Sequence, residues 1–299
     1  MNKMYMKTVF SILALFTYGS TKALGSESIP NEFILTNDIT HPVVDDPNEI
    51  YEQNKHLLCT NTEEIYHASE VMDDALEKLY YYAENEYVYN LYKEYNRDTR
   101  LHFNNNIANE GIGKFDIKIR YPDAYDEIVN ILWDPNGATK YNPDFVSGKV
   151  IHVYNPNLLM IQQRYKNGFT DTHKYFYALT AKYKISETRT IITMSTVNVN
   201  DRNRKDGNEY VNTIVKSADL FKANVDSEED IRNGELKKMF VQLSGYLITK
   251  KKDYVEIINI DSINDNDSDS TPESHKLSNK FKRMERLMEL NDYISNKYI

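Results

Sequence analysis

The sequence predicts an α+β fold in which an antiparallel β-sheet is closed by a long last helix. Three observations support this class. A long amphipathic helical stripe follows residue 60, alternating strand-like segments dominate the middle of the chain, and an amphipathic segment ends it. No internal repeat is visible, so a solenoid or other repeat architecture is not expected.

The chain opens with a pattern typical of a secretory signal peptide. Lys3 and Lys7 precede an apolar core of about a dozen residues, and small residues follow. Such a core is too short for a spanning helix, and we expect cleavage near Ala23 to Gly25. Residues 1–25 contain three lysines and no acid, so their removal changes the formal net charge from −9 to −12. A chain this acidic is a poor non-specific binder of nucleic acid.

The rest of the chain is expected to be soluble and free of disulfides. No later segment approaches the ~18 consecutive apolar residues that a membrane span needs. Cys59 is the single cysteine, so a core of substantial size must stabilise the fold. We interpret Cys59 as an incidental thiol, with intermolecular pairing as the alternative.

Residues 26–60 are predicted to be an exposed linker, because three prolines lie there among Asn and Asp. A long helix is predicted to follow, over residues 61–92. Asn61 and Glu64 resemble a capping box at its start. Its apolar stripe consists of Ile65, Ala68, Met72, Ala75, Leu79, Tyr82 and Ala83.

Strands dominate the middle of the chain. Leu101 and Phe103 begin one, residues 113–120 form the next, and a short helix from Pro122 ends at the turn of residues 134–137. The later predicted strands cover residues 149–154, 157–165, 173–185, 190–199, 209–217, 236–250 and 254–260, with a short helical turn within 226–234. The terminal helix has an apolar face made of Leu277, Phe281, Met284, Met288 and Ile294.

The two strands between His173 and Val199 have two faces that are both largely apolar. Tyr175 and Tyr177 begin one face of the first strand, while Thr193 and Ser195 share a face of the second with Ile191 and two valines. A sheet with one face in water alternates more sharply than this. Both faces are therefore expected to be covered, and on one of them the covering group could be a ligand that is not protein.

The sequence offers no recognisable catalytic motif. The seven histidines lie far apart with no pair at metal-ligand spacing, so no metal site is predicted. Residues 111–115 (GIGKF) lack the remainder of a phosphate-binding loop, and Cys59 has no evident base partner. We therefore expect a protein that is not an enzyme and needs no cofactor.

Two compositional features leave alternatives open. The chain has 24 tyrosines against one tryptophan, which suits a cavity lining that meets both chains and headgroups but suits an ordinary core as well. The basic run at residues 280–286 (KFKRMER) is interpreted as a solvated helix face. The alternative is a surface that contacts anionic lipid headgroups.

Four segments carry a family resemblance: WDPN at residues 133–136, VYNPNLLMIQQRY, KYFYALTAKYKISETRTIITMSTVNVNDRN, and NTIVKSADLFKANVDSEEDIRNGELKKMFVQLSGYLI. They resemble the fam-a proteins of rodent malaria parasites, which are similar to the START (StAR-related lipid transfer) domains. The resemblance covers residues 61–299, as one START-like domain. It implies a helix-grip fold, in which a curved antiparallel sheet wraps around the C-terminal helix with an internal lipid cavity between them. One face of the strand pair at residues 173–199 would line that cavity, with Thr193 and Ser195 orienting the ligand.

The resemblance also implies candidate lipid-binding residues. Phosphatidylcholine-binding members begin this strand with Arg-Asp-aromatic, and His173-Lys174-Tyr175 keeps only the aromatic, which would hold a quaternary ammonium. Their phosphate-binding Arg has no counterpart in residues 138–142, so Arg164 or Lys140 would have to replace it. The candidate set is Tyr175, Tyr177, Arg164, Tyr141, Thr193 and Ser195.

The function implied is a monomeric, secreted carrier of one phospholipid, phosphatidylcholine or a relative, that contacts membranes transiently. The resemblance also implies export from the parasite to the parasitophorous vacuole or the host red cell. Residues 22–26 resemble the basic-x-Leu-x-acidic export signal of such proteins but end in Ser26 instead of an acidic residue. The alternative is an adhesion or host-interaction protein whose cavity is filled. A lining of Ala, Ser and Thr favours the carrier, and one plugged by Tyr and Phe favours the alternative.

Overall fold

The computed structural model describes residues 49–104, 111–166, 172–205, 211–267 and 271–298, all within the unit formed by residues 42–299. The predicted signal peptide and linker residues 26–48 lie outside the described residues. None of the described helices combines the length and apolarity that crossing a membrane requires.

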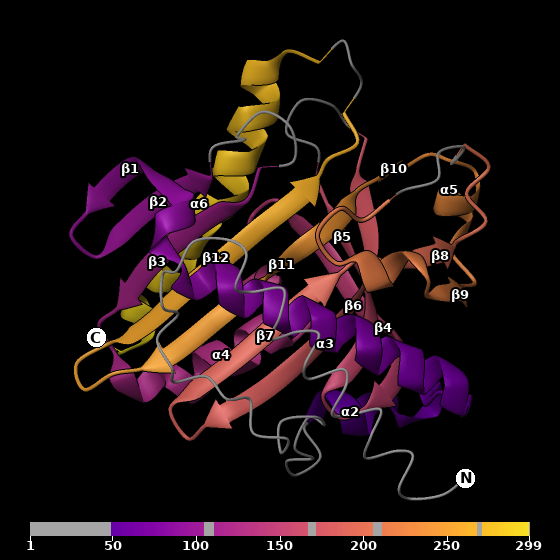
Figure 1. Cartoon of the computed structure of the whole chain (residues 1–299), viewed down its shortest axis with the longest axis horizontal. Helices are drawn as coiled ribbons and strands as arrows, with labels where there is room; N and C mark the ends of the chain where they lie inside the picture. The colour runs from indigo at the N-terminus through magenta and orange to yellow at the C-terminus, as the bar shows by residue number, and fades with distance from the viewer. Residues whose placement is uncertain (1–48, 105–110, 167–171, 206–210, 268–270, 299) are drawn as a thin grey trace, which may run out of the picture. The chain divides into compact units, whose positions relative to one another are not determined.

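Ten strands of the described chain form one sheet (Figure 1). Nine of them follow the order β1-β2-β3-β12-β11-β7-β6-β5-β4 with antiparallel neighbours, and β10 pairs with β6 in parallel. The nine strands are β1 (Tyr89–Asn96), β2 (Thr99–Asn104), β3 (Gly113–Ile119), β4 (Phe145–Asn155), β5 (Leu158–Tyr165), β6 (Lys174–Ser186), β7 (Arg189–Ser195), β11 (Phe240–Lys250) and β12 (Val255–Asn264). The predicted antiparallel sheet is confirmed.

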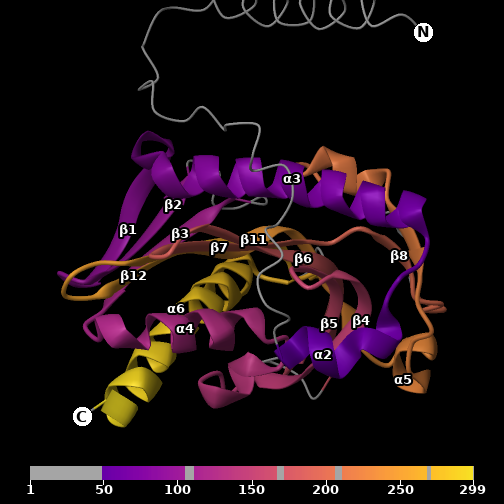
Figure 2. The same ribbon diagram turned by 90° about the horizontal axis from the view of Figure 1, so that it is seen from below.

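Helices cover both faces of this sheet (Figure 2). The helix α3 (Thr62–Glu84) lies on one face, and α4 (Tyr125–Trp133) and α6 (Glu273–Tyr298) lie on the other. We call these the α3 face and the α6 face. Their arrangement around the last helix confirms the predicted α+β, helix-grip class.

Each face carries its own apolar core, because side chains alternate between the two faces of a strand. On the α3 face the helix residues Met72, Ala75 and Leu79 pack on the sheet residues Leu179, Ile191, Leu243 and Leu247. On the α6 face the buried helix residues Met284, Leu287, Leu290 and Ile294 pack with Phe103, Phe115, Ile117, Ile192 and Ile257. The four predicted apolar positions Leu277, Phe281, Met288 and Ile294 also lie along this helix, with Ile294 fully buried.

A compact insertion separates β7 from β11. It contains β8 (Asn198–Asn200), the 3-10 helix η5 (Lys216–Asp219), β9 (Lys222–Asn224), α5 (Glu229–Arg232) and β10 (Lys237–Lys238). The strands β8 and β9 form a separate parallel pair. The predicted helical turn within residues 226–234 corresponds to α5.

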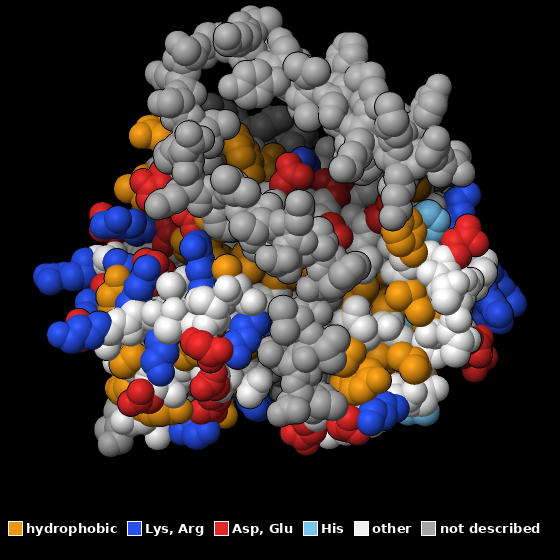
Figure 3. Space-filling view, turned by 60° about the horizontal axis from the view of Figure 1, so that its bottom comes forward, with side chains coloured by type: hydrophobic (Ala, Val, Ile, Leu, Met, Phe, Trp, Pro, Cys, Tyr) orange, Lys and Arg blue, Asp and Glu red, His pale blue; other side chains and the backbone are white. Residues whose placement is uncertain are grey.

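One edge of the sheet, β1, is largely exposed. Its residues include Lys93 and Glu94, and Figure 3 shows Lys and Arg side chains gathering on the side of the molecule where β1, β2 and β3 lie. Charged edge strands discourage pairing with another chain.

The start of α3 agrees with the sequence prediction. The Asn61 side chain accepts hydrogen bonds from the backbone N–H groups of Glu63 and Glu64, at 3.1 and 3.3 Å. The Glu64 carboxylate does not complete a capping box and instead accepts a hydrogen bond from the Tyr154 hydroxyl at 2.9 Å. This contact connects the first turn of α3 to β4.

Three sequence predictions of secondary structure are wrong. The first long helix ends at Glu84, since residues 89–96 pair with β2 as β1. No strand covers residues 211–217, because the Asn212 side chain accepts from the backbone of Ile214 and Val215 and so forms a turn. The linker prediction also fails for α2 (Glu49–Asn54), an amphipathic turn whose Ile50 and Tyr51 pack against the α6-face core.

Gly245 on β11 leaves room for the Leu79 side chain of α3 and for the backbone of the neighbouring strand β7. A Cβ atom there would lie 2.1 Å from the Ile192 carbonyl oxygen and 2.5 Å from Leu79 Cδ1. We expect Gly245→Val to lower the free energy of unfolding by about 3 kcal/mol, as overpacked cores do. Urea denaturation measures the change. Ser147→Val on exposed β4 is the control and should change stability by less than about 0.5 kcal/mol. Equal effects of the two variants would contradict this role of Gly245.

Candidate functional site

A pocket of about 140 Å³ lies between the α6 face of the sheet and the N-terminal half of α6. Strands β5, β6, β7, β11 and β12 supply its floor. Its lining includes Gln163, Tyr165, Lys174, Phe176, Met194, Ser244, Tyr246, Asn259, Asp261 and Ile263 from the sheet, Tyr141 and Asp144 from the loop before β4, and Asn279, Lys282, Arg283, Arg286 and Leu287 from α6.

An ion cluster centred on Arg283 closes one wall of the pocket. The guanidinium donates to both carboxylate oxygens of Asp261, at 2.9 and 2.8 Å, and to Asp265 at 3.1 Å. Lys174 of β6 donates to the other oxygen of Asp265 at 3.2 Å. Although burial raises the pKa of Asp265, Arg283 and Lys174 lower it more strongly, so this carboxyl stays ionised. The cluster connects α6, β12 and β6.

A second ion pair lies on the other side of the pocket. Arg286 donates from Nε to Asp144 at 3.1 Å and from Nη1 to Glu289 at 2.9 Å. Lys282 lies 3.7 Å from Asp144 and is half exposed. The lining as a whole holds five Lys and Arg side chains and three Asp side chains, so its net charge is positive.

Aromatic side chains fill most of the remaining space. Tyr165 stacks on Phe176, with ring centroids 6.2 Å apart, and donates its hydroxyl proton to Gln163 at 2.9 Å. The hydroxyls of Tyr141 and Tyr246 interact with each other. Burial, together with the charge of Asp261, raises the pKa of Tyr246 to about 12, so these rings are neutral at physiological pH.

The sequence of β12 contains a signal for this pocket. In β12 the residues Val255, Ile257, Asn259 and Asp261 share the α6 face, so the face changes from apolar to polar along the strand. On α6, Arg283 and Arg286 precede Leu287 at helical spacing and belong to the same side. On β12 the polar residues that continue an apolar alternation could have marked the site, whereas on α6 Arg283 and Arg286 lie beside the predicted apolar face and give no such signal.

Only one of the six candidate residues from the sequence, Tyr141, lines this pocket. Tyr175 and Tyr177 belong to the α3-face core, and Thr193 and Ser195 share the alternation of Ile191 and Val197, which also lie in that core. The expectation that this face lines the cavity is therefore corrected. The physical reason is that both faces are apolar, so alternation groups the residues without showing which group faces which helix.

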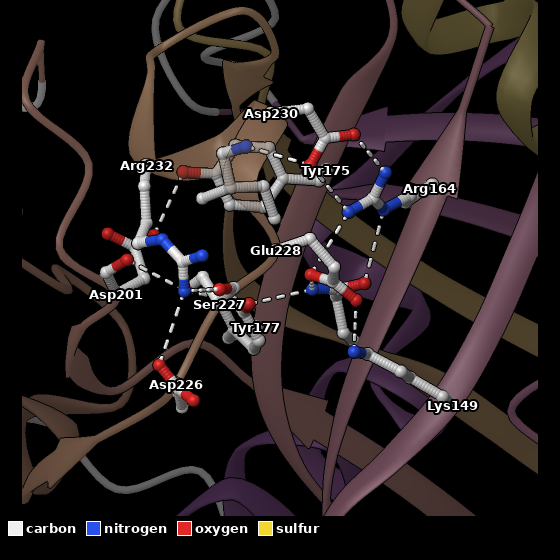
Figure 4. A network of polar contacts seen from close by, with 12 residues as sticks. Lys149, Arg164, Tyr175, Tyr177, Asp201, Asp226, Ser227, Glu228, Asp230 and Arg232 are labelled. Atoms are coloured by element: carbon white, nitrogen blue, oxygen red, sulfur yellow. Dashed lines mark hydrogen bonds and ion pairs between the residues drawn. The ribbon is translucent and has the colours of Figure 1, made fainter.

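Three candidates do meet in one network, at the end of the α3 face covered by the insertion (Figure 4). Arg164 donates to both carboxylate oxygens of Asp230, at 2.6 and 3.1 Å, and pairs with Glu228 at 3.0 Å. The other two candidates take part through their hydroxyls: Tyr177 donates to Ser227 at 3.2 Å, and Tyr175 donates to Asp201 at 2.9 Å.

This network is electrostatically complete without a ligand. Burial raises the pKa of Glu228, but hydrogen bonds from Lys149 and Gln162 lower it to about 2. Gln162 also donates to Tyr177 at 2.6 Å, and Ser227 donates to the backbone oxygen of Asp201 at 2.7 Å. The network fastens the insertion to β5 and β6, and Arg164 is committed to carboxylates there.

The basic run of residues 280–286 is not a solvated face. Arg283 and Arg286 point into the pocket wall, and Lys280 is buried and donates to the Gly111 backbone oxygen. Of its cations only Lys282 is largely exposed. The alternation of charge with Phe281 and Met284 predicts an amphipathic helix, but ion pairs to the sheet turned part of the charged side inward.

The described residues hold no cluster of three or more His, Cys, Asp or Glu side chains arranged to bind a metal ion. The chemistry that the pocket can offer is recognition: aromatic faces and carboxylates for a cation, and guanidinium groups for an anion.

Comparisons with known proteins support the fold. No protein-family model matches the chain, and no curated protein sequence matches it. One similar solved structure is human StAR-related lipid transfer protein 5, with a TM-score of 0.58 and 11% sequence identity; the match covers 78% of this chain and 98% of that chain. Another is human STARD10, with a TM-score of 0.54 and 12% sequence identity; the match covers 73% of this chain and 77% of that chain. The chain therefore has a START-like helix-grip fold.

The Arg283 cluster predicts a stability change with a characteristic pH dependence. Arg283→Met leaves the carboxylates of Asp261 and Asp265, which are only 5% and 13% exposed, without their main partner. At pH 7 we expect a loss of about 3 kcal/mol in the free energy of unfolding. In the native protein Asp265 has a lowered pKa, so its contribution exists above its unfolded value and disappears as the pH falls through its folded value.

In Arg283→Met the positive charge that lowers the pKa of Asp265 is lost while its burial remains, so the pKa of Asp265 in the folded protein rises. The variant should therefore lose less stability at pH 4 than at pH 7, measured by urea denaturation at both values. Arg202→Met, an exposed pair with Asp226 at 3.2 Å, is the control and should show little change at either pH. A loss in Arg283→Met that is independent of pH would show that packing, not charge, explains the effect.

Proposed function

We propose that this protein is a lipid carrier that takes up one phospholipid between the sheet and α6, with the headgroup in the pocket beside Arg283. The single observation that carries the proposal is the position of the pocket, between the sheet and the helix that it grips, with cations and aromatic rings on the same wall. The START-like fold supports it, because the two similar structures belong to proteins named for lipid transfer or for this domain.

The lining suits a zwitterionic phosphocholine group. Tyr141, Tyr165 and Tyr246 supply faces for a quaternary ammonium, with Asp261 nearby. Arg286 and Lys282 supply positive charge for the phosphate. The predicted aromatic residue for choline, Tyr175, is replaced in this proposal by tyrosines on the other face of the sheet.

Uptake of the acyl chains requires the N-terminal half of α6 to move. Small-molecule pockets commonly reach about 300–1,000 Å³, and 140 Å³ accommodates a headgroup at most. Displacing Phe176, Met194 and Leu287 would extend the space along the α6 face, which is apolar beyond the pocket. Burial of each CH₂ group contributes about 0.8 kcal/mol, so two acyl chains supply a large driving force.

The alternative function is protein binding by a START-like domain whose cavity is filled. The small pocket volume and the three tyrosines and one phenylalanine in its lining favour this alternative. In that case the ion pairs of α6 are permanent, and no lipid is exchanged.

Native mass spectrometry of the full chain purified from a lipid-containing host tests the carrier. We expect a 1:1 complex with a phospholipid, whose mass gives the headgroup class, and transfer of labelled phosphatidylcholine between vesicles. Asn279→Trp, which narrows the pocket from α6, should reduce transfer at least tenfold. Asn296→Trp, near the exposed end of the same helix, should not. A ligand-free protein without transfer activity would leave the protein-binding alternative.

We also propose that the chain is a fam-a protein exported into the parasitophorous vacuole or the host red cell. The sequence resemblance and the signal-peptide pattern of residues 1–25 support this. A C-terminally tagged chain expressed in rodent blood-stage parasites should be found outside the parasite membrane, and a chain lacking residues 1–25 should stay inside. Retention of both forms in the parasite would contradict export.

A further inference from the structure

A second, larger depression lies on the α3 face, away from the pocket at α6. It has a volume of about 420 Å³, and eleven of its fifteen lining residues are charged. We call it the charged groove. Its lining is Ala83, Glu84, Glu86, Arg97, Asp98, Arg100, Lys114, Asp116, Lys118, Arg189, Leu247, Thr249, Lys251, Glu256 and Ile258.

The groove forms because α3 is shorter than the sheet face that it covers. The helix ends at Glu84, and the strands continue beyond it. On β3 the residues Lys114, Asp116 and Lys118 alternate with Phe115 and Ile117 of the α6 face, so the α3 face beyond the end of α3 carries charged side chains, of which Lys114 is buried. Figure 3 shows Lys and Arg side chains concentrated on this side of the molecule.

Two polar atoms of the lining are buried without a hydrogen bond, one acceptor and one donor. Asp116 Oδ1 accepts none; the Lys114 ammonium is 3.7 Å from it, and His102 Nδ1 is 3.2 Å from the other oxygen of this carboxylate. Arg189 Nε donates none, although its Nη2 pairs with Glu84. Buried polar atoms are nearly always hydrogen-bonded in proteins, so two such exceptions in one lining indicate a place for a ligand that both donates and accepts.

Several charges of the groove are also available for a ligand. Asp98 is engaged by Arg120, at 2.6 and 2.9 Å, and Arg100 by Glu94 at 3.3 Å. By contrast, among the described residues Arg97, Lys118 and Lys251 have no carboxylate within ion-pair distance. These three cations come from the β1–β2 turn, β3 and the β11–β12 turn, which meet at one end of the sheet. The Lys118 backbone N–H donates to the Asp98 backbone oxygen at 3.0 Å, and Lys118 lies opposite Glu256 of β12 in the strand pairing.

We propose that the charged groove binds a phosphorylated polyol, such as a sugar phosphate or an inositol phosphate group. One hydroxyl group of a polyol can donate to Asp116 Oδ1 while another accepts from Arg189 Nε, which lies three strands away. A phosphate group can pair with Arg97, Lys118 and Lys251, for which no carboxylate among the described residues lies within ion-pair distance. The volume is within the range of small-molecule sites. This site is on the opposite face of the sheet from the lipid pocket, and the inference does not rest on lipid transport.

Isothermal titration calorimetry on the full chain tests the proposal with three soluble probes: glucose 6-phosphate, inositol trisphosphate and inorganic phosphate. At least one phosphorylated polyol should bind at least tenfold more tightly than inorganic phosphate, and unphosphorylated glucose should not bind. A second experiment measures binding to vesicles with and without a phosphoinositide, and it shows whether the protein binds the phosphorylated polyol as a free molecule or as a lipid headgroup. Binding in either experiment supports a site for a phosphorylated polyol.

The double variant Arg97→Ala with Lys251→Ala changes only turn residues and should weaken binding at least tenfold. Lys252→Ala, in the same turn but outside the lining, is the matched control and should leave affinity unchanged. Asp116→Asn should weaken binding of the phosphorylated polyol more than that of inorganic phosphate, because Asp116 contacts the hydroxyl. Failure of all probes to bind, or binding that is equal for inorganic phosphate and insensitive to the double variant, would overturn the proposal.

Discussion

The constraint on which the structure depends is that the ten-stranded sheet has two apolar faces and both need a cover. Strand alternation places Leu179 and Ile191 on one side and Phe176 and Ile192 on the other, so both faces of the central strands are apolar and need a cover. The helix α3 covers one face, and α4 with α6 covers the other. In a chain with a single cysteine, this double burial takes over the role that disulfides have in many secreted proteins.

Most of the fold follows from sequence periodicity, whereas the site does not. The apolar stripe of α3 and the alternation in β3, β5 and β12 predict these elements directly, because burial on one side imposes a period of 3.6 or 2. The boundary at Glu84 was missed because residues 85–92 can continue a helix locally, and only pairing with β2 shows them to be a strand. That pairing is a tertiary contact, which local sequence does not reveal.

The misplacement of the site has a related cause. A strand buried on both faces looks the same from either side, so the resemblance to lipid-binding proteins indicated the strands but not the face. Tyr175, Tyr177 and Arg164 are aromatic or cationic, yet each has a partner in the insertion network. The pocket is lined instead by their neighbours on the opposite face of the same strands, such as Tyr165 and Phe176, together with residues of β11, β12 and α6.

The helix α6 is attached to the sheet in two physically different ways along its length. Its C-terminal half is held by apolar burial at Leu290 and Ile294, which is lost in full when the helix separates from the sheet. Its N-terminal half and middle combine burial of Met284 and Phe281 with ion pairs of Arg283 and Arg286, whose partners regain hydration or a ligand phosphate when the pairs open. A phosphate that replaces a carboxylate would therefore offset part of the cost of separating this half, whereas nothing replaces the apolar burial of the C-terminal half. A movement that admits a lipid should begin at this end and pivot near Leu287, where the ionic part of the contact gives way to the apolar part.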